Sequence, residues 1–250
     1  MQPEEKPARV VTKQGESARD WAKERLEKKD FVIFDVETTD LKGEIIQIGL
    51  CDHEGNALMN TRIKPTHHEI SEWVIENIGI TPDDVNDAPT FGEVMHTFVE
   101  IIRDQAVIAY NASFDRQRLQ TTIDVSGLPL LSHIPSQWNC AMKRYCQYNP
   151  DKVGNNGRLG AWWKLEEAIA QENIKPDNPN YHDALFDVRS TLAIMQAMPG
   201  YEITAFDGNN NPLPIKQSEH DTFKVGARIP SKRSKPLTGP IHAFLPPYQF

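Results

Sequence analysis

Two carboxylates stand at the end of a short apolar run near the start of the chain. The run is FVIFDV, residues 31–36, and Asp35 and Glu37 lie two residues apart at its end. In an extended strand their side chains leave the same face, about 7 Å apart. Carboxylates are seldom buried unless they are paired or bind a metal, and neither residue has a basic neighbour in sequence. The pair is therefore a candidate metal site, although Asp-x-Glu alone is also typical of surface hairpins.

Two further acids and one histidine complete the set of candidate residues. Asp115 follows a second short apolar run, residues 107–110, where an acid is also an ordinary first-turn residue of a helix. His182 and Asp187 lie at the start of a predicted helix over residues 183–198. Five helical residues turn through about 500°, so the two side chains do not share a helix face, and we expect His182 to project from the preceding loop. A lone histidine is usually a surface or core residue, so its significance depends on the acids around it.

Hydrophobic patterns predict the strands that must position these residues. Residues 31–36, 45–51 and 57–63 are predicted strands, and the turn 52–56 joins the last two, so the first three strands form a meander. Residues 107–110 are a further buried strand. Because both faces of residues 31–36 are apolar, we expect the first strand inside a sheet that is covered on both sides.

Helices are predicted between and after the strands. The capping box Thr90-x-x-Glu93 opens one whose buried face is Phe91, Val94, Met95, Phe98 and Ile102. A second helix carries Trp162, Leu165, Ile169 and Glu172 and ends at Lys175-Pro176. The last, residues 183–198, has its apolar stripe at Leu185, Val188, Leu192 and Met195. Residues 139–145 show no clear pattern.

Strands that are followed by helices and further strands predict an α/β fold, in which helices flank a mixed sheet. This domain is expected to span residues 30–199. Residues 1–29 form a predicted N-terminal extension, with one short docking helix that begins at Ser17. Residues 200–250 contain seven of the 18 prolines and are predicted to be an irregular, Pro-rich tail.

Composition narrows the class of protein. The chain has 250 residues, of which 39% are hydrophobic and 25% charged, as expected of a soluble globular protein. No run approaches the roughly 20 apolar residues that span a bilayer, and the N-terminus lacks the apolar core of a signal peptide. We therefore expect a cytoplasmic protein without a membrane partner. The formal net charge of −8 argues against a protein that coats duplex DNA by general electrostatic attraction.

The charge is uneven along the chain, because residues 222–250 contain five basic residues and no acidic one. The candidate phosphate contacts in this tail are Lys224, Arg228, Lys232 and Arg233. A solvated basic loop is the simpler interpretation of the asymmetry. The tail is also a candidate docking segment for a protein partner, whereas its aromatic end, residues 242–250, is expected to pack on its own domain.

Taken together, the motifs resemble those of the DnaQ-like 3′-5′ exonucleases of the DEDDh type, a family with an RNase H-like fold. The motifs are FVIFDVETTD, AYNASFD and HDALFD, they occur in the order of the family, and the resemblance covers residues 30–198. The alternative subgroup of the family has Tyr four residues before the last Asp, where this chain has Asp183, so the chain resembles the His subgroup. The segment WNCAMKRY and the helix after it look most like exonuclease X and the proofreading subunit of bacterial replicative DNA polymerase.

The resemblance implies a reaction and a role for each residue. The expected reaction is hydrolysis of phosphodiester bonds from the 3′ end of DNA, single-stranded or frayed, with release of nucleoside 5′-monophosphates. The expected cofactors are two divalent cations, Mg²⁺ or Mn²⁺, since hard oxygen ligands favour them over zinc. Asp35, Glu37 and Asp187 would hold the first cation and Asp35 with Asp115 the second, while His182 would be the general base. The expected substrate-binding residues are Thr38, Thr39, Asn111 and Phe114.

The chain departs from the family pattern at three places. Asp40 stands where Gly is usual and is expected to adopt a left-handed turn, and Tyr110 stands where His is frequent. Asp183 is expected to interact with the neighbouring His182 and favour its charged form. Two alternatives stay open. The substrate could be short RNA, because no motif reports contacts to the 2′-hydroxyl, or the chain could be a partner-binding module that has lost catalysis, against which the five filled positions count.

Overall fold

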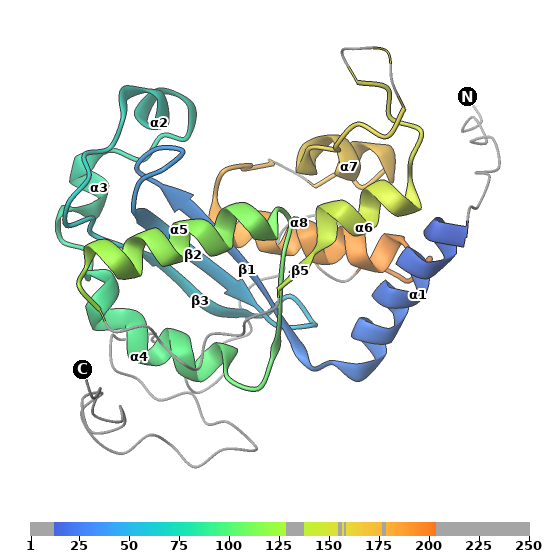
Figure 1. Ribbon diagram of the computed structural model, residues 1–250, viewed down its shortest axis with the longest axis horizontal. Coiled ribbons are helices and arrows are strands. Elements are labelled where there is room, and N and C mark those ends of the chain that lie inside the picture. The colour runs from blue at the N-terminus through green and yellow to red at the C-terminus, as the bar shows by residue number, and fades with distance from the viewer. Residues whose placement is uncertain (1–12, 129–137, 155–156, 158, 177–178, 204–250) are drawn as a thin grey trace, which may run out of the picture.

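The computed structural model describes residues 13–128, 138–154, 157, 159–176 and 179–203. Within them, five strands form one mixed sheet in the order β3-β2-β1-β4-β5 (Figure 1). The predicted phosphate contacts and the aromatic end of the tail lie outside the described residues, and their roles stay predictions. The residues concerned are Lys224, Arg228, Lys232, Arg233 and 242–250.

Three of the strands form the predicted meander. β1 (Phe31–Thr38), β2 (Ile45–Cys51) and β3 (Ala57–Arg62) are antiparallel neighbours, which confirms the hairpin expected around residues 52–56. β4 (Ala106–Ala109) runs parallel to β1 and begins and ends one residue earlier than predicted. β5 (Asn139–Cys140) is parallel to β4 at the edge of the sheet. β1 is therefore a central strand with neighbours of both directions.

The helices lie before, between and after these strands. Their bounds are α1 (Lys13–Lys28), α2 (Glu72–Asn77), α3 (Pro82–Asn86), α4 (Phe91–Ile102), α5 (Ala112–Val125), α6 (Ala141–Tyr148), α7 (Leu165–Gln171) and α8 (Ala184–Ala197). In the part of the chain that is described, none of them is long and apolar enough to cross a bilayer.

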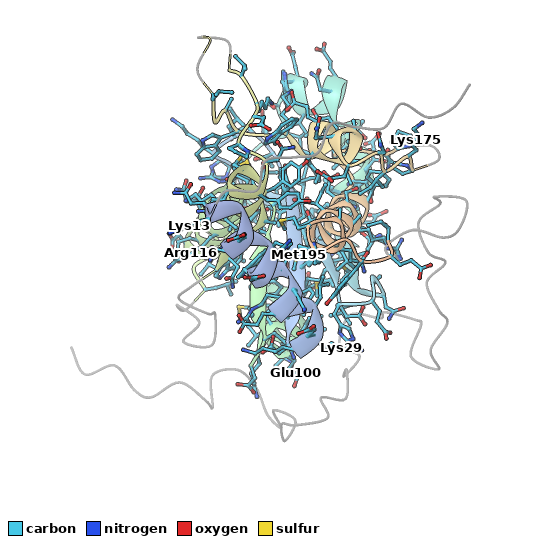
Figure 2. All side chains as sticks on the ribbon, turned by 90° about the vertical axis from the view of Figure 1, so that its right-hand side faces the viewer. Lys13, Lys29, Glu100, Arg116, Lys175 and Met195 are labelled. Carbon is cyan, nitrogen blue, oxygen red and sulfur yellow. The ribbon has the colours of Figure 1, made fainter. Side chains whose placement is uncertain are left out.

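Helices cover both faces of the sheet. One apolar core, which includes Phe31, lies between the first face and helices α1, α6, α7 and α8. A second core, which includes Phe34, lies between the opposite face and helices α4 and α5. In a view turned by 90°, Met195 of α8 lies in the interior behind α1, whereas Lys175 lies at the periphery (Figure 2). The α/β architecture with flanking helices is as predicted.

The last helix, α8, is buried far beyond its predicted stripe. Its apolar stripe packs in the core as expected, but Arg189, Ser190, Thr191 and Gln196 are also buried. α8 contacts β1 and β2 on one side and α1, α6 and α7 on the other, so no side of it is left to solvent. Because α8 is locked between these layers, residues at its start are held against the sheet.

The N-terminal helix begins earlier than predicted. α1 is already helical at Lys13, so Ser17 lies inside it rather than at its cap. Gly15 is buried on the same side as Ala18 and Ala22, at helical spacing, and this extends the packed face toward the N-terminus. The expected docking is present, because α1 packs against α6 and α8.

The helix predicted around Trp162 is shorter at both ends. Glu167 accepts the backbone N–H of Lys164 at 2.8 Å, which caps α7 just after that residue and leaves Trp162 outside the helix and 59% exposed. At the other end, Asn173 adopts a φ of 60°, a left-handed conformation that ends helices, so α7 stops before Pro176 is reached. The proline is therefore not what terminates the helix.

Residues 139–145, which have no clear sequence pattern, contain β5 and the start of α6. β5 is only two residues long, too short for alternation to be visible. Its pairing with β4 comes from tertiary contact and not from local propensity.

Candidate active site

The five predicted catalytic residues line one pocket at the carboxyl end of β1. The pocket has a volume of about 240 Å³ and lies where β1 meets the start of α5 and the residues before α8. Its lining residues are Asp35, Val36, Glu37, Thr38, Asp40, Leu41, Trp73, Val74, Ile78, Tyr110, Asn111, Phe114, Asp115, Leu165, His182 and Asp187. Three motifs that are far apart in the sequence thus meet at one place.

β1 supplies two of the carboxylates from one face of the sheet. Asp35 and Glu37 are two and four residues after Ile33 in β1, so all three side chains lie on the same face of the strand. Ile33 belongs to the core beneath α8. Both acids therefore point to the α8 side, as their spacing predicts. Glu37 is 6% exposed, while Asp35 is partly exposed at the pocket wall.

α5 supplies the third carboxylate from its first turn. Asn111 is the N-cap of α5, and Asp115 lies in the turn that follows, where it is 2% exposed. Its carboxylate accepts the backbone N–H of Val36, so the acid is tied to β1. The first-turn position expected from sequence is correct, and the same residue also faces the pocket.

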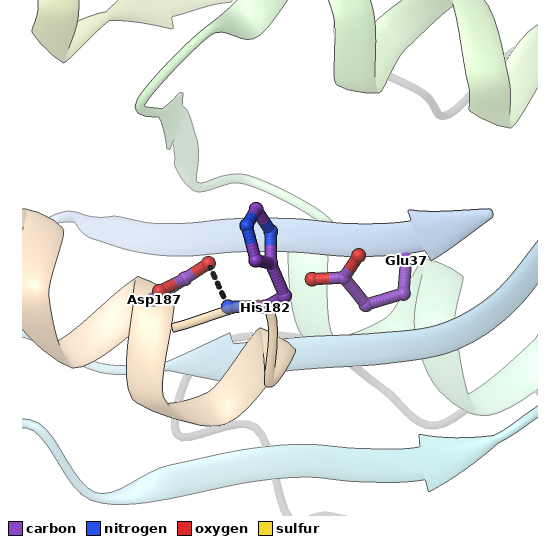
Figure 3. Close-up of side chains that lie close together, drawn as sticks. All are labelled: Glu37, His182 and Asp187. Atoms are coloured by element: carbon purple, nitrogen blue, oxygen red, sulfur yellow. Dashed lines mark hydrogen bonds between the residues drawn. The ribbon is translucent and has the colours of Figure 1, made fainter. Parts of the chain in front are cut away.

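The segment before α8 supplies the histidine, and α8 itself the last acid. His182 precedes the N-cap Asp183 and has a φ of 68°, so it projects from the loop as predicted. Its backbone N–H donates to Asp187 Oδ2 at 3.2 Å. Figure 3 shows the carboxylates of Glu37 and Asp187 pointing toward each other from β1 and α8, with the His182 ring beside them. The side chain of Asp183 bonds elsewhere, to the N–H of Phe186 and to Gln47, rather than to His182.

Burial raises the pKa of the four predicted catalytic carboxyl groups. Desolvation is the largest cause for Asp35, Glu37, Asp115 and Asp187, and mutual repulsion among the acids adds to it. It raises the pKa of Asp115 to about 8 and that of Asp187 to about 7. The positive charge of Arg62 lowers the pKa of Glu37, but this effect is smaller than that of burial. The pocket therefore needs additional positive charge if all of its acids are to be ionised near neutral pH.

The residues of the pocket fit divalent cations. Oδ1 of Asp187 is buried and has no hydrogen-bond partner in the described part of the chain, while Oδ2 accepts the His182 N–H. One ligand atom each from Glu37, His182 and Asp187 lie within 4.8 Å of one another. Carboxylate oxygens are the ligands that Mg²⁺ and Mn²⁺ prefer. An orphaned acceptor among buried, repelling carboxylates is what a site for hard cations requires.

Three of the four predicted substrate-binding residues line the pocket, and Thr39 does not. Thr38, Asn111 and Phe114 are part of the wall. Thr39 is fully buried, and its side chain fills the space beside Gly43, where a Cβ would lie 1.8 Å from Thr39 Oγ1. The side chain of Thr39 is thus covered by the loop after β1, and its contact with substrate stays a prediction.

Asp40 forms its turn without a left-handed backbone, contrary to expectation. It is not among the residues with positive φ. Instead its Oδ1 accepts the N–H of Lys42 at 2.6 Å, and its carbonyl accepts the hydroxyl of Thr38 at 2.7 Å. An aspartate makes such a side-chain turn readily, whereas glycine cannot. The substitution of the usual glycine is therefore accommodated locally.

The pocket also contains apolar residues that the sequence did not single out. Leu41 and Trp73 line its mouth and are 77% and 56% exposed. Trp73 lies in α2, a six-residue helix that begins after Ser71, which caps it by accepting the N–H of Val74. A Ser three residues before a Val is a faint helix signal, and nothing local links this segment to β1.

Comparison with known proteins agrees with this arrangement. The chain matches the model of the RNase_T family, described as an exonuclease, over residues 32–195. It is 32% identical over 176 residues to the uncharacterized exonuclease CP81 of Escherichia phage 186, a match that covers 68% of this chain and 88% of that protein. It is 36% identical over 205 residues to the PolC-type DNA polymerase III of Staphylococcus aureus, which covers 80% of this chain but only 13% of the polymerase.

A solved structure shows the same fold. The nuclease domain of 3′hExo, a DEDDh family member bound to rAMP, superposes with a TM-score of 0.51 at 17% identity, covering 69% of this chain and 94% of that domain. The likeness confirms the expected RNase H-like arrangement of a mixed sheet with flanking helices.

Proposed function

The chain belongs to the RNase_T exonuclease family and is a 3′-5′ exonuclease, and from that premise we propose that it removes nucleotides from the 3′ end of single-stranded or frayed DNA and releases nucleoside 5′-monophosphates. The observation that carries the proposal is the convergence of four buried or half-buried carboxylates and one histidine in a single pocket. Separate motifs with no other reason to meet supply these groups. A pocket rich in acids attracts cations rather than a phosphate directly.

The acids are proposed to hold two divalent cations, Mg²⁺ or Mn²⁺. Asp35, Glu37 and Asp187 would hold one, and Asp35 with Asp115 the other. When bound, such a pair stabilises the attacking and leaving oxygens of an in-line displacement at phosphorus. The raised pKa values of these carboxyl groups support the assignment, because bound cations restore their ionised forms.

His182 is proposed to be the general base that takes the proton of the attacking water. Its ring lies beside the carboxylates of Glu37 and Asp187 and is exposed to solvent, so water can reach it. A base must lie within hydrogen-bond reach of the proton that it removes. The oxygen-rich acids suit Mg²⁺ or Mn²⁺ better than the imidazole does, which favours a base over a ligand.

The rim of the pocket is proposed to hold the terminal nucleotide. Trp73 and Phe114 supply aromatic side chains to the lining, and Leu41 adds an exposed apolar one. Stacking on such side chains is tolerant of sequence, because every base has a π-face. A base within a duplex is stacked on its neighbours and held by its pair, whereas an unpaired terminal base is free to stack on the protein, which supports single-stranded or frayed ends as the substrate. Thr38 and Asn111 supply polar groups beside the acids.

Digestion of end-labelled substrates tests the proposal. Single-stranded DNA, duplex DNA and RNA of one sequence, labelled at the 5′ end, are incubated with Mg²⁺, Mn²⁺ or EDTA. We expect a ladder that shortens from the 3′ end, fastest on single-stranded DNA, and abolished by EDTA and by Asp35→Ala. His182→Ala should slow the reaction by about 10²- to 10⁴-fold. Asp124→Ala is the matched control, because Asp124 is an exposed acid of α5 that does not line the pocket.

Each other outcome has a distinct meaning. Faster digestion of RNA than of DNA would replace the proposed substrate with short RNA. A wild-type chain that digests nothing with either cation would overturn the proposed reaction and favour a partner-binding module. Equal loss of activity in Asp124→Ala would show that the assay reports folding rather than chemistry.

A further inference from the structure

β2 presents two residues to the start of α8, directly opposite the acids of β1. In the sheet, Glu37 pairs with Gln47 and Asp35 pairs with Gly49. Paired residues of neighbouring strands point to the same face. Gln47 and Gly49 therefore lie on the α8 side, one strand away from the carboxylates.

Gly49 allows the backbone of α8 to approach the sheet. A Cβ at this position would lie 2.4 Å from the carbonyl carbon and oxygen of Ala184 and 2.8 Å from the backbone nitrogen of Leu185. No larger residue fits without moving the helix. The first turn of α8 therefore rests directly on β2.

Gln47 bonds to that first turn with both ends of its side-chain amide. Its Nε2 donates to Asp183 Oδ2 at 3.0 Å, and its Oε1 accepts the Ala184 N–H at 3.4 Å. Arg62, which pairs with Gln47 on β3, donates to the same Oε1 at 2.7 Å. Since Arg62 can only donate, the amide atom that it contacts must be the oxygen, which leaves Nε2 to donate to Asp183. Gln47 is 3% exposed, so these bonds are shielded from water.

The bonds of Gln47 to Asp183 and Ala184 restrain the segment that includes His182. The other oxygen of Asp183 accepts the Phe186 N–H at 3.1 Å, so Asp183 caps α8 while it is bonded to Gln47. His182 comes immediately before and has a φ of 68°. A left-handed backbone is rare for a residue with a Cβ and persists where the surrounding structure enforces it. The contacts around this residue are the bond of its own N–H to Asp187 and the bond of Gln47 to the next residue, Asp183.

We propose that Gln47 is a positioning residue of the reaction: braced by Arg62, it holds Asp183 and thereby keeps the His182 imidazole beside the carboxylates of the pocket. The inference rests on the proposed function, in which His182 is the general base. Gln47 does not line the pocket, so it acts through the loop before α8 and not through the substrate.

Three substitutions separate positioning from folding. Gln47→Ala removes both bonds to α8. Gln47→Glu keeps an acceptor for Arg62 and Ala184 but sets a carboxylate against Asp183. Combining Gln47→Glu with Asp183→Asn restores the hydrogen bond with its direction reversed, because the asparagine amide at 183 can donate to the carboxylate at 47. Asparagine also remains a good N-cap for α8. Asn60→Ala is the matched control, because the exposed Asn60 accepts from the same Nε2 at 3.2 Å without touching α8.

Two readouts are measured. The first is kcat and KM for 3′-end digestion of single-stranded DNA with Mg²⁺. We expect Gln47→Ala and Gln47→Glu to lower kcat about 10-fold or more while KM stays within about twofold, since a misplaced base affects the chemical step. The double variant should recover most of the loss, and Asn60→Ala should match wild type. The second readout is amide hydrogen exchange of residues 182–187 without DNA or cation, which should accelerate only in the two Gln47 single variants.

The proposal is overturned if Gln47→Ala retains the wild-type kcat. It is equally overturned if the double variant recovers the wild-type hydrogen exchange of residues 182–187 but not kcat, because Gln47 would then serve the fold alone. Failure of the proposed function looks different: wild type itself would digest nothing, and the exchange measurement would still decide whether Gln47 orders the loop.

Discussion

Replacing Asp115 with asparagine is expected to stabilise the cation-free protein at alkaline pH. Burial, with a further contribution from Asp187, raises the pKa of Asp115 to about 8 in the folded state, against 3.8 for an ordinary aspartate. In the unfolded chain the carboxyl ionises near its ordinary value. The folded state therefore loses stability as the pH rises above 3.8, and the loss is complete above about 8. Asparagine has no proton to lose, so the variant avoids this loss.

The size of the effect follows from the two pKa values. Each pH unit is worth about 1.4 kcal/mol, so the interval between 3.8 and about 8 sets a ceiling of about 6 kcal/mol. Because the acids of the pocket repel one another, their protons are lost over a broad pH range, and we expect a measured gain of about 2 kcal/mol. Asparagine keeps an oxygen that can accept the N–H of Val36, as the carboxylate does. The substitution thus removes charge with little change of shape.

Urea unfolding followed by tryptophan fluorescence measures this gain. In EDTA, Asp115→Asn should exceed wild type in free energy of unfolding at about pH 8, with a smaller difference at about pH 5. In excess Mg²⁺ the order should reverse, because wild type binds the cation more tightly and gains stability from it. The control Asp124→Asn, an exposed acid of the same helix, should stay within about 0.5 kcal/mol of wild type in each condition.

One result would refute the electrostatic reasoning. If Asp115→Asn is destabilised in EDTA by the same amount at both pH values, Asp115 stabilises the fold through hydrogen bonds, and its charge does not lower the free energy of unfolding. The inference that the pocket needs cations would then lose its main support.

Three other substitutions probe the walls of the pocket and the contact between β2 and α8. Trp73→Ala should weaken binding of single-stranded DNA, measured by fluorescence anisotropy, by about 5- to 150-fold, since stacking of one base on an aromatic ring is worth about 1–3 kcal/mol. Tyr110→Phe removes the bond from its hydroxyl to the Trp163 carbonyl, 3.0 Å long, and should lower the free energy of unfolding by about 1–2 kcal/mol in a urea titration. Gly49→Ala places a methyl group 2.4 Å from the backbone of Ala184 and should cost about 1–3 kcal/mol by the same titration, together with a fall in kcat.

The sequence predicts those parts of the fold that depend on local patterns. The capping box at Thr90 is present, because Glu93 accepts both the N–H and the hydroxyl of Thr90, at 2.7 and 2.8 Å. The parity of Asp35 and Glu37 is also correct, since alternation along a strand needs no knowledge of its neighbours. Helix phase likewise places His182 in the loop before α8. In each case the cause lies within a few residues of the effect.

Other features of the pocket depend on contacts between distant segments of the chain. Thr39 is adjacent to the motif that contains Asp35 and Glu37, yet its carbonyl accepts the N–H of Ser71 and its side chain is covered by the loop at Gly43. Trp73 reaches the pocket only because the segment after β3 folds back beside β1. Neither outcome follows from propensity or periodicity, because both depend on the path of a loop across the end of the sheet.

For Gln47, the sequence indicates that the side chain needs a buried hydrogen-bond partner but does not identify that partner. β2 reads IIQIGLC, and all seven residues are buried, so a single amide in this run must find partners inside the protein. The run itself cannot say that the partner Asp183 lies 136 residues further on. Sheet pairing supplies that information, because it places Glu37, Gln47 and Arg62 in one row across three strands. A slip of one residue between β1 and β2 would turn Gln47 away from α8. The register of the sheet therefore sets both the acid that faces the pocket and the amide that bonds to Asp183 beside His182.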